Sequence, residues 1–144
     1  MRRVRVTSTF GDLSRARLRL LRMELSGADA NCDCVARPPD AWDAHLPRKA
    51  GERNASMQAL KDSIAIRQLL FSTMPNLQSA SLRIYRQRTD ERMELVITGV
   101  LSREAQPPKT VRSLVMRAKL FGFRFWLDEG VLESLESEDY AVNA

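Results

Sequence analysis

Three residues in the first third of the chain are of types that could bind a metal ion. Cys32 and Cys34 are separated by one residue, and the only histidine, His45, follows in the same segment. Thiolates and an imidazole are ligands that zinc and copper(I) prefer. A second Cys or His pair is missing. The sequence therefore supports two interpretations, a soft-metal site formed by these three residues and a loop that carries two incidental thiols.

The sequence contains few residues in patterns that would support disulfide bonding, catalysis or phosphate binding. A disulfide between Cys32 and Cys34 would close almost no loop and constrain the unfolded chain very little, so we expect reduced thiols and a cytoplasmic location. Any catalytic site that needs an imidazole would have to use His45. The six glycines are scattered and form no phosphate-binding loop. We therefore expect no enzymatic activity and no cofactor.

Arginines gather at two places where they could contact a nucleic acid. Cationic side chains can follow the phosphates while an aromatic ring stacks on a base. The alternative is that these side chains cover the solvent face of a sheet, and the acidic residues near the C-terminus could offset them. The candidates are Arg2, Arg3, Arg5, Arg15, Arg17 and Arg19 near the N-terminus, and Arg83, Arg86 and Arg88 with Tyr85.

The pattern before residue 26 is compatible with strands or with a helix. Alternating apolar and basic residues around positions 4–6 and 16–20 are typical of two strands joined by a turn at residues 11–14. The alternation shifts at Leu20 and Leu21 and resumes at Met23, which predicts a β-bulge. A helix over residues 14–25 is the alternative, because Leu18, Leu21 and Leu25 would share one face.

Residues 26–55 are rich in Gly, Asn, Asp, Ala and Pro. The prolines at 38, 39 and 47 break any regular pattern. A structureless stretch of this length is uncommon inside a compact domain, so it predicts a linker and a domain boundary.

Beyond this stretch the periodicity predicts a helix, two strands, a second helix and a last strand. The first helix is expected over residues 57–74, with Asn54 or Ser56 as its cap, and the two strands over 80–85 and 93–98 around a polar hairpin loop. The second helix follows Pro107 and Pro108, with Thr110 as its cap and Gly122 as its left-handed end. Phe123, Phe125 and Leu127 then mark the inner face of the last strand.

With one strand from residues 1–55, this order becomes β-α-β-β-α-β, a two-layer α+β sandwich of the ferredoxin-like class. The second half contains IRQLL at 66–70, LRI at 82–84, RMELVI at 92–97, VRSLVMRAKL at 111–120 and GFRFW at 122–126. With these segments it resembles the cytosolic C-terminal domain of MgtC/SapB-type membrane proteins. The resemblance covers about half the chain and implies an ACT-like fold that pairs through strand edges or helices and binds small effectors.

We therefore predict a basic N-terminal arm or hairpin and linker (residues 1–55), an ACT-like domain (56–136) and an acidic tail (137–144). The predicted function is that of a non-enzymatic regulatory or protein-interaction module that senses a ligand and associates as a homodimer or with another protein. No apolar run is long enough to cross a bilayer, so membrane association would require a partner. The alternatives are a nucleic-acid-binding accessory protein, which would use the N-terminal arginines and the Arg83–Arg92 sheet face, and a thiol metal-binding protein.

Overall fold

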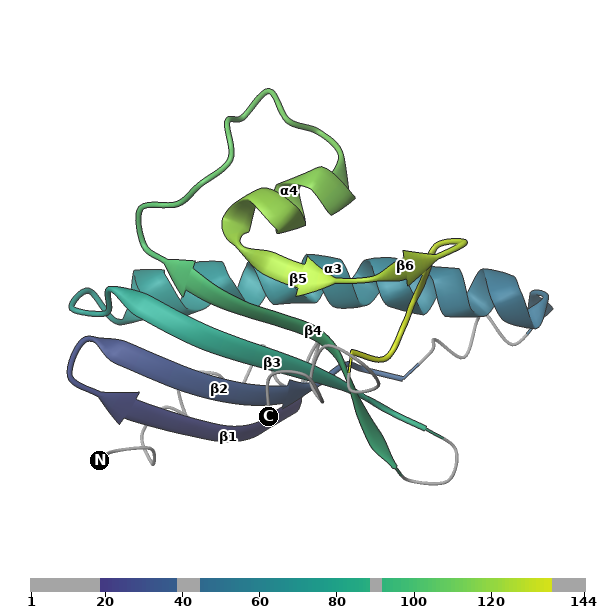
Figure 1. The fold of residues 1–144 in the computed structure, drawn as a ribbon, viewed down its shortest axis with the longest axis horizontal. Coiled ribbons are helices and arrows are strands. Elements are labelled where there is room, and N and C mark those ends of the chain that lie inside the picture. Colours follow the sequence, from purple (N-terminus) through teal and green to yellow (C-terminus); the bar gives the residue numbers. More distant parts are fainter. Residues whose placement is uncertain (1–18, 39–44, 89–91, 136–144) are drawn as a thin grey trace.

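The computed structural model describes residues 19–38, 45–88 and 92–135, which form one mixed sheet, two helices and a small hairpin (Figure 1). The sheet order is β1-β2-β3-β4-β5, and only β2 and β3 run parallel. In chain order the elements are β1 (Arg19–Ser26), β2 (Asp29–Val35), α3 (Arg48–Thr73), β3 (Ser79–Gln87), β4 (Met93–Ser102), α4 (Leu114–Phe121), β5 (Phe123–Phe125), β6 (Leu127–Asp128) and β7 (Val131–Leu132).

The sheet has an apolar inner face, toward α3, and a polar outer face. The strands pair so that side chains of one kind line up across all five of them. One inner row contains Leu20, Cys34, Ile84, Ile97 and Phe125. The adjacent outer row contains Arg22, Asp33, Arg83, Thr98 and Arg124.

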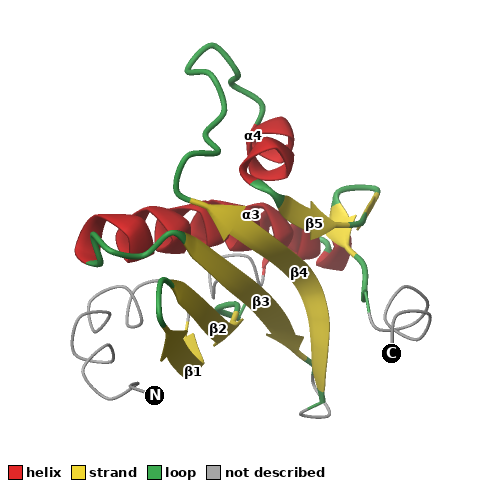
Figure 2. Cartoon of the chain, turned by 60° about the vertical axis from the view of Figure 1, so that its left-hand side comes forward, coloured by secondary structure: helices red, strands yellow, loops and turns green. Residues whose placement is uncertain are grey.

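Figures 1 and 2 show α3 passing behind the sheet, with α4 near its β5 end. The helices α3 and α4 contact each other, and α4 also contacts β5. Because side chains alternate between the faces of a strand, this placement buries every second residue and leaves the polar rows on the other side.

The strand interpretation of residues 19–25 is confirmed, including the bulge. The pairing of β1 with β2 shifts between Leu20 and Arg22, and Leu21 points to solvent with 48% of its surface exposed. Met23 is buried beside Cys32. The alternative helix is therefore wrong for these residues, since every second side chain points toward the core, as in a strand. The predicted strand segments before residue 19 lie outside the described residues.

The predicted linker is wrong where the structure describes it. Residues 26–55 include β2 and the first turns of α3. Ala30, Cys32 and Cys34 are almost fully buried, and such small side chains gave no strong strand pattern in the sequence. The helix begins at Arg48 after Pro47, without a side-chain cap. Its first turn contacts a distant segment, because Lys49 forms an ion pair with Glu129.

The later elements are confirmed, and β3 and β4 are longer than predicted. The last strand is shorter, because β5 ends at Phe125 and Leu127 belongs to β6 of the small hairpin. Gly122 ends α4 in the left-handed conformation, at φ 116°. The cap of α4 is Ser113 rather than Thr110, since the Ser113 hydroxyl accepts a hydrogen bond from the Met116 N–H. Gly122 also lies close to Gly99, where an added Cβ would meet the Gly122 carbonyl oxygen at 2.9 Å. The α4–β5 turn thus packs directly on β4.

The α+β class is confirmed, but the order is not strictly β-α-β-β-α-β. The additional strand β1 pairs antiparallel with β2, and the β6–β7 hairpin follows β5. In the sheet, β2 and β3 are direct neighbours joined through α3, whereas the predicted split arrangement separates such a parallel pair by another strand. In the described part of the chain, no helix is long and apolar enough to cross a membrane.

Candidate binding surfaces

The three predicted metal ligands do not form a site. Cys32 and Cys34 lie two residues apart on β2, so both thiols point into the core, where they are 1% and 0% exposed. His45 is exposed, ahead of α3. Among the residues that the structure describes, no three His, Cys, Asp or Glu side chains are grouped to hold a metal ion. The described structure therefore does not bring these three residues together as a metal site.

Burial also makes the two thiols unreactive. Burial, followed by the nearby Asp33 carboxylate, raises the pKa of Cys32 from 9.0 to about 12. The pKa of Cys34 is raised as well, mainly by burial. Because the thiolate is the nucleophile and the metal ligand, neither cysteine is available for such chemistry near neutral pH.

The predicted arginines near Tyr85 are occupied by ion pairs inside the protein. Arg83 donates two hydrogen bonds to Asp33, from Nε at 2.8 Å and from Nη2 at 3.2 Å. Arg86 and Arg88 both contact the Glu94 carboxylate, at 2.7 and 3.1 Å. These three guanidinium groups are thus partly neutralised by carboxylates of neighbouring strands.

The structure does not gather the other predicted nucleic-acid residues around these three. Tyr85 is half-buried, and Arg19 is exposed at the start of β1. Arg2, Arg3, Arg5, Arg15 and Arg17 lie outside the described residues.

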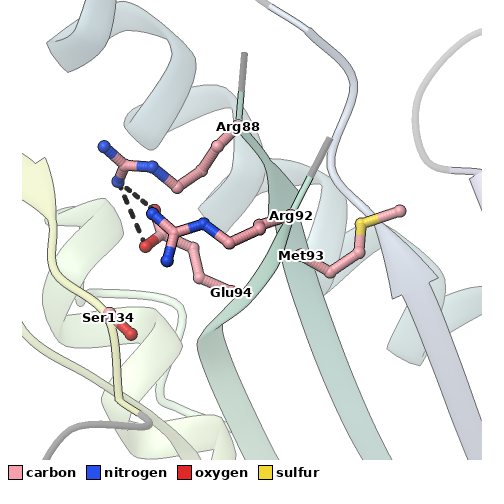
Figure 3. Close-up of a pocket in the computed structure, with 5 residues that line it drawn as sticks. All are labelled: Arg88, Arg92, Met93, Glu94 and Ser134. Carbon is pink, nitrogen blue, oxygen red and sulfur yellow. Dashed lines mark hydrogen bonds and ion pairs between the residues drawn. The ribbon is translucent and has the colours of Figure 1, made fainter. Parts of the chain in front are cut away.

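A polar pocket of about 280 Å³ lies beside the end of the β3–β4 hairpin. Its lining residues are Arg88, Arg92, Met93, Glu94 and Ser134 (Figure 3). Figure 3 shows Arg88 and Arg92 directed toward Glu94, with Met93 pointing away. Since Arg86 and Arg88 already bind the Glu94 carboxylate, it is not set up as a general base. The pocket is best explained as an ion-pair cluster that closes the end of the sandwich.

A second group of cations, around α4 and β5, is not neutralised in this way. From Ala105 to Leu127 the sequence has five basic residues and no Asp or Glu. One of the five, Arg117, is used internally, because it donates to the Val111 carbonyl and lies 5.6 Å from the centre of the Phe121 ring. Among the described residues no ion pair involves the other four, which are Lys109, Arg112, Lys119 and Arg124.

Exposed apolar side chains accompany these four cations. Met116 and Leu120 are half-exposed one turn apart on α4, and Trp126, after β5, has 69% of its surface exposed. We call the seven residues the α4–β5 surface: Lys109, Arg112, Met116, Lys119, Leu120, Arg124 and Trp126. This surface was not predicted from the sequence, in which the N-terminal arginines are more densely grouped. Its signal, a stretch of cations with no carboxylate, was present in the sequence.

No family model, curated protein or solved structure matches this chain. The resemblance to the MgtC/SapB cytosolic domain therefore stays a prediction.

Proposed function

We propose that this protein is a non-enzymatic interaction module that binds an anionic partner through the α4–β5 surface. The observation that carries the proposal is a stretch of basic residues without a carboxylate, from Ala105 to Leu127, in which four exposed cations without ion pairs in the described structure accompany exposed apolar side chains. In the sheet, by contrast, Arg22 and Arg83 are paired with Asp33. A surface on which cations are left unpaired beside exposed apolar groups is suited to a partner that supplies the negative charge.

The rigid fold supports this assignment. The α4–β5 turn packs on β4 through Gly99 and Gly122, and Ala118 and Phe121 anchor α4 in the core. The cations of α4 and β5 are therefore held on regular elements rather than on a long loop, which lowers the entropy lost on binding.

The proposal is tested with heparin as a generic polyanion. Two variants remove the same positive charge from different surfaces, and both are compared with the unaltered protein in salt elution from a heparin column. The first is Lys109→Gln/Arg112→Gln/Lys119→Gln/Arg124→Gln. The control is Arg19→Gln/Arg48→Gln/Arg53→Gln/Lys61→Gln, all at exposed positions.

We expect the first variant to elute at clearly lower salt and the control to elute close to the unaltered protein. Equal losses would show that retention follows net charge alone. In that case the α4–β5 surface would not be a binding site.

Self-association is a second candidate, favoured by the charge pattern along the chain. The basic segment 105–127 is followed by six carboxylates and no basic residue, at Asp128, Glu129, Glu133, Glu136, Glu138 and Asp139. The acidic residues of one copy could then meet the basic surface of another. Sedimentation velocity at low and moderate salt tests this. A dimer that dissociates with salt supports the candidate, and a monomer at both salts rejects it.

A further inference from the structure

The alternation of β5 continues one residue beyond the strand and presents Trp126 together with Arg124. Phe123 and Phe125 are buried, whereas Arg124 and Trp126 are exposed. Because alternate residues of an extended chain share one side, the indole and the guanidinium group emerge on the same, outer side of the sheet. Thr98, the lateral neighbour of Arg124, belongs to the same polar row.

A cation of α4 reaches this strand as well. The Lys119 Nζ lies 5.7 Å from the centre of the buried Phe125 ring, so Lys119 approaches β5 from its inner side, opposite to Arg124 and Trp126. Because β5 is the last strand of the sheet, the two sides meet at its free edge. Arg112 and Lys109 precede α4 and are exposed. The surface thus combines one large exposed aromatic ring with cations from two successive elements.

We propose that the α4–β5 surface binds single-stranded nucleic acid, with the Trp126 ring stacking on a base and the four cations contacting phosphates. This inference rests on the proposed function and names its partner. Aromatic stacking combined with a positively charged surface is how proteins bind single strands without reading their sequence. An unpaired base can rotate away from its neighbours and stack on Trp126, whereas the bases of a duplex remain stacked on each other.

An acidic protein segment is the competing partner, and the exposed indole argues against it. Carboxylates would satisfy the four cations, but they would leave the face of the ring without a matching group. A nucleic acid supplies both the negative charge and a flat ring within each nucleotide. The observed pairing of cations with an exposed ring is therefore explained more completely by a single strand.

The fluorescence of Trp126 gives a direct test. The chain has two tryptophans, Trp42 and Trp126, so the Trp42→Phe variant of the full-length protein reports on Trp126 alone. An oligothymidylate of about fifteen nucleotides is the probe, long enough for one binding site. Stacking is expected to quench the fluorescence in a saturable manner. With four phosphate contacts, the logarithm of the binding constant should fall with the logarithm of the salt concentration with a slope of about −3.

A second measurement uses fluorescence anisotropy of labelled oligothymidylate with the otherwise unaltered protein. Trp126→Leu should weaken binding by about 5-fold to 100-fold, the range found when one stacked base loses its aromatic partner. Leu46→Ala is the matched control, because Leu46 is also an exposed apolar residue but lies ahead of α3. Its affinity should remain that of the unaltered protein.

Four outcomes would overturn the inference. Oligothymidylate binding without a change in Trp126 fluorescence rejects stacking, and a duplex of the same length that binds equally well rejects the preference for single strands. Binding of a polyglutamate peptide in place of oligothymidylate moves the partner to an acidic protein and leaves the proposed function standing. If the surface variant also elutes from heparin like the control, both the inference and the proposed function fail.

Discussion

The guanidinium carbon of Arg67 lies 4.8 Å from the centre of the Phe121 ring, which joins α3 to α4 inside the core. On its other side the same group lies 4.8 Å from the ring of Phe71. Arg67 is 1% exposed, and its Nη2 donates to the carbonyl oxygens of Ser102 and Arg103, both at 3.0 Å. A buried cation thus fastens the segment after β4 to the helix layer.

Arg67→Met should destabilise the protein by about 2–4 kcal/mol. The change keeps most of the side-chain volume but leaves buried carbonyl oxygens without their donor, and it removes the contact between the cation and the two rings. Urea denaturation measures the loss. Arg117→Met is the control, since Arg117 also contacts the Phe121 ring but is less buried, and it should cost less than about 1 kcal/mol. Equal losses in the two variants would contradict a special role for Arg67.

The buried thiols predict a loss of stability at alkaline pH. The folded protein holds the pKa of Cys32 at about 12, above the ordinary value of 9.0, and the pKa of Cys34 is raised in the same direction. In the unfolded chain both thiols release their protons near pH 9.0. Their contribution is therefore fully present below pH 9 and is lost as the pH rises toward 12.

Across this window each thiol should lower the free energy of unfolding by about 1.4 kcal/mol per pH unit. Urea denaturation between pH 8 and pH 10.5, chosen about the thiol value of 9.0, measures the slope. The Cys32→Ala/Cys34→Ala variant corrects for other groups that titrate here, and its slope should be shallower. A thiol reagent should label the native protein only after unfolding. Rapid labelling of the folded protein would show that the thiols are accessible.

The cap of α4 gives a prediction with a built-in control. Ser113→Ala removes the hydroxyl that accepts from the Met116 N–H and should cost about 1 kcal/mol. Thr110→Ala, at the position that the sequence pattern suggested, should cost almost nothing because Thr110 lies before the helix and is exposed. Hydrogen exchange at the Met116 amide should become faster in the first variant only. A larger effect at Thr110 would place the helix start earlier than in the structure.

The sequence predicted those elements in which large apolar residues repeat regularly. Leu82 and Ile84 alternate with polar residues and thereby predict β3. Gly122 predicts the end of α4, because glycine readily adopts the left-handed conformation. The pattern failed at β2, where the buried side chains are as small as Ala30 and Cys32. It also failed for the start of α3, where Lys49 of the first turn pairs with Glu129, far along the chain.

The candidate site was less predictable because it depends on contacts between distant residues. Local sequence places Arg83 among other arginines, but only the sheet shows that Asp33, fifty positions away, neutralises it. Likewise, the spacing of Cys32 and Cys34 is compatible with a metal site. In a strand, however, residues two apart point to the same side, and here both thiols point into the core. Which cations remain unpaired can be decided only once the strands are paired.

The polar row on the outer face offers a final test of the binding proposal. Asp33 accepts from Arg83, and Arg22 lies 3.2 Å from the same carboxylate, so one acid restrains two cations in the row that ends at Arg124. Asp33→Asn keeps the shape and removes the charge. If a single strand extends from Trp126 across this face, the loss of this negative charge should tighten oligothymidylate binding and make the salt slope steeper by about one unit. Salt titrations followed by anisotropy measure both effects.

Glu94→Gln is the matched control for this experiment. It removes the same charge and frees Arg86 and Arg88, but those residues lie near β7, on the helix side of the sheet, where Arg86 Nη1 donates to the Leu132 carbonyl. The salt slope should therefore remain unchanged in this variant. Equal steepening in both variants would mean that binding responds to net charge rather than to the outer face. No change in either variant would confine the strand to the α4–β5 surface itself.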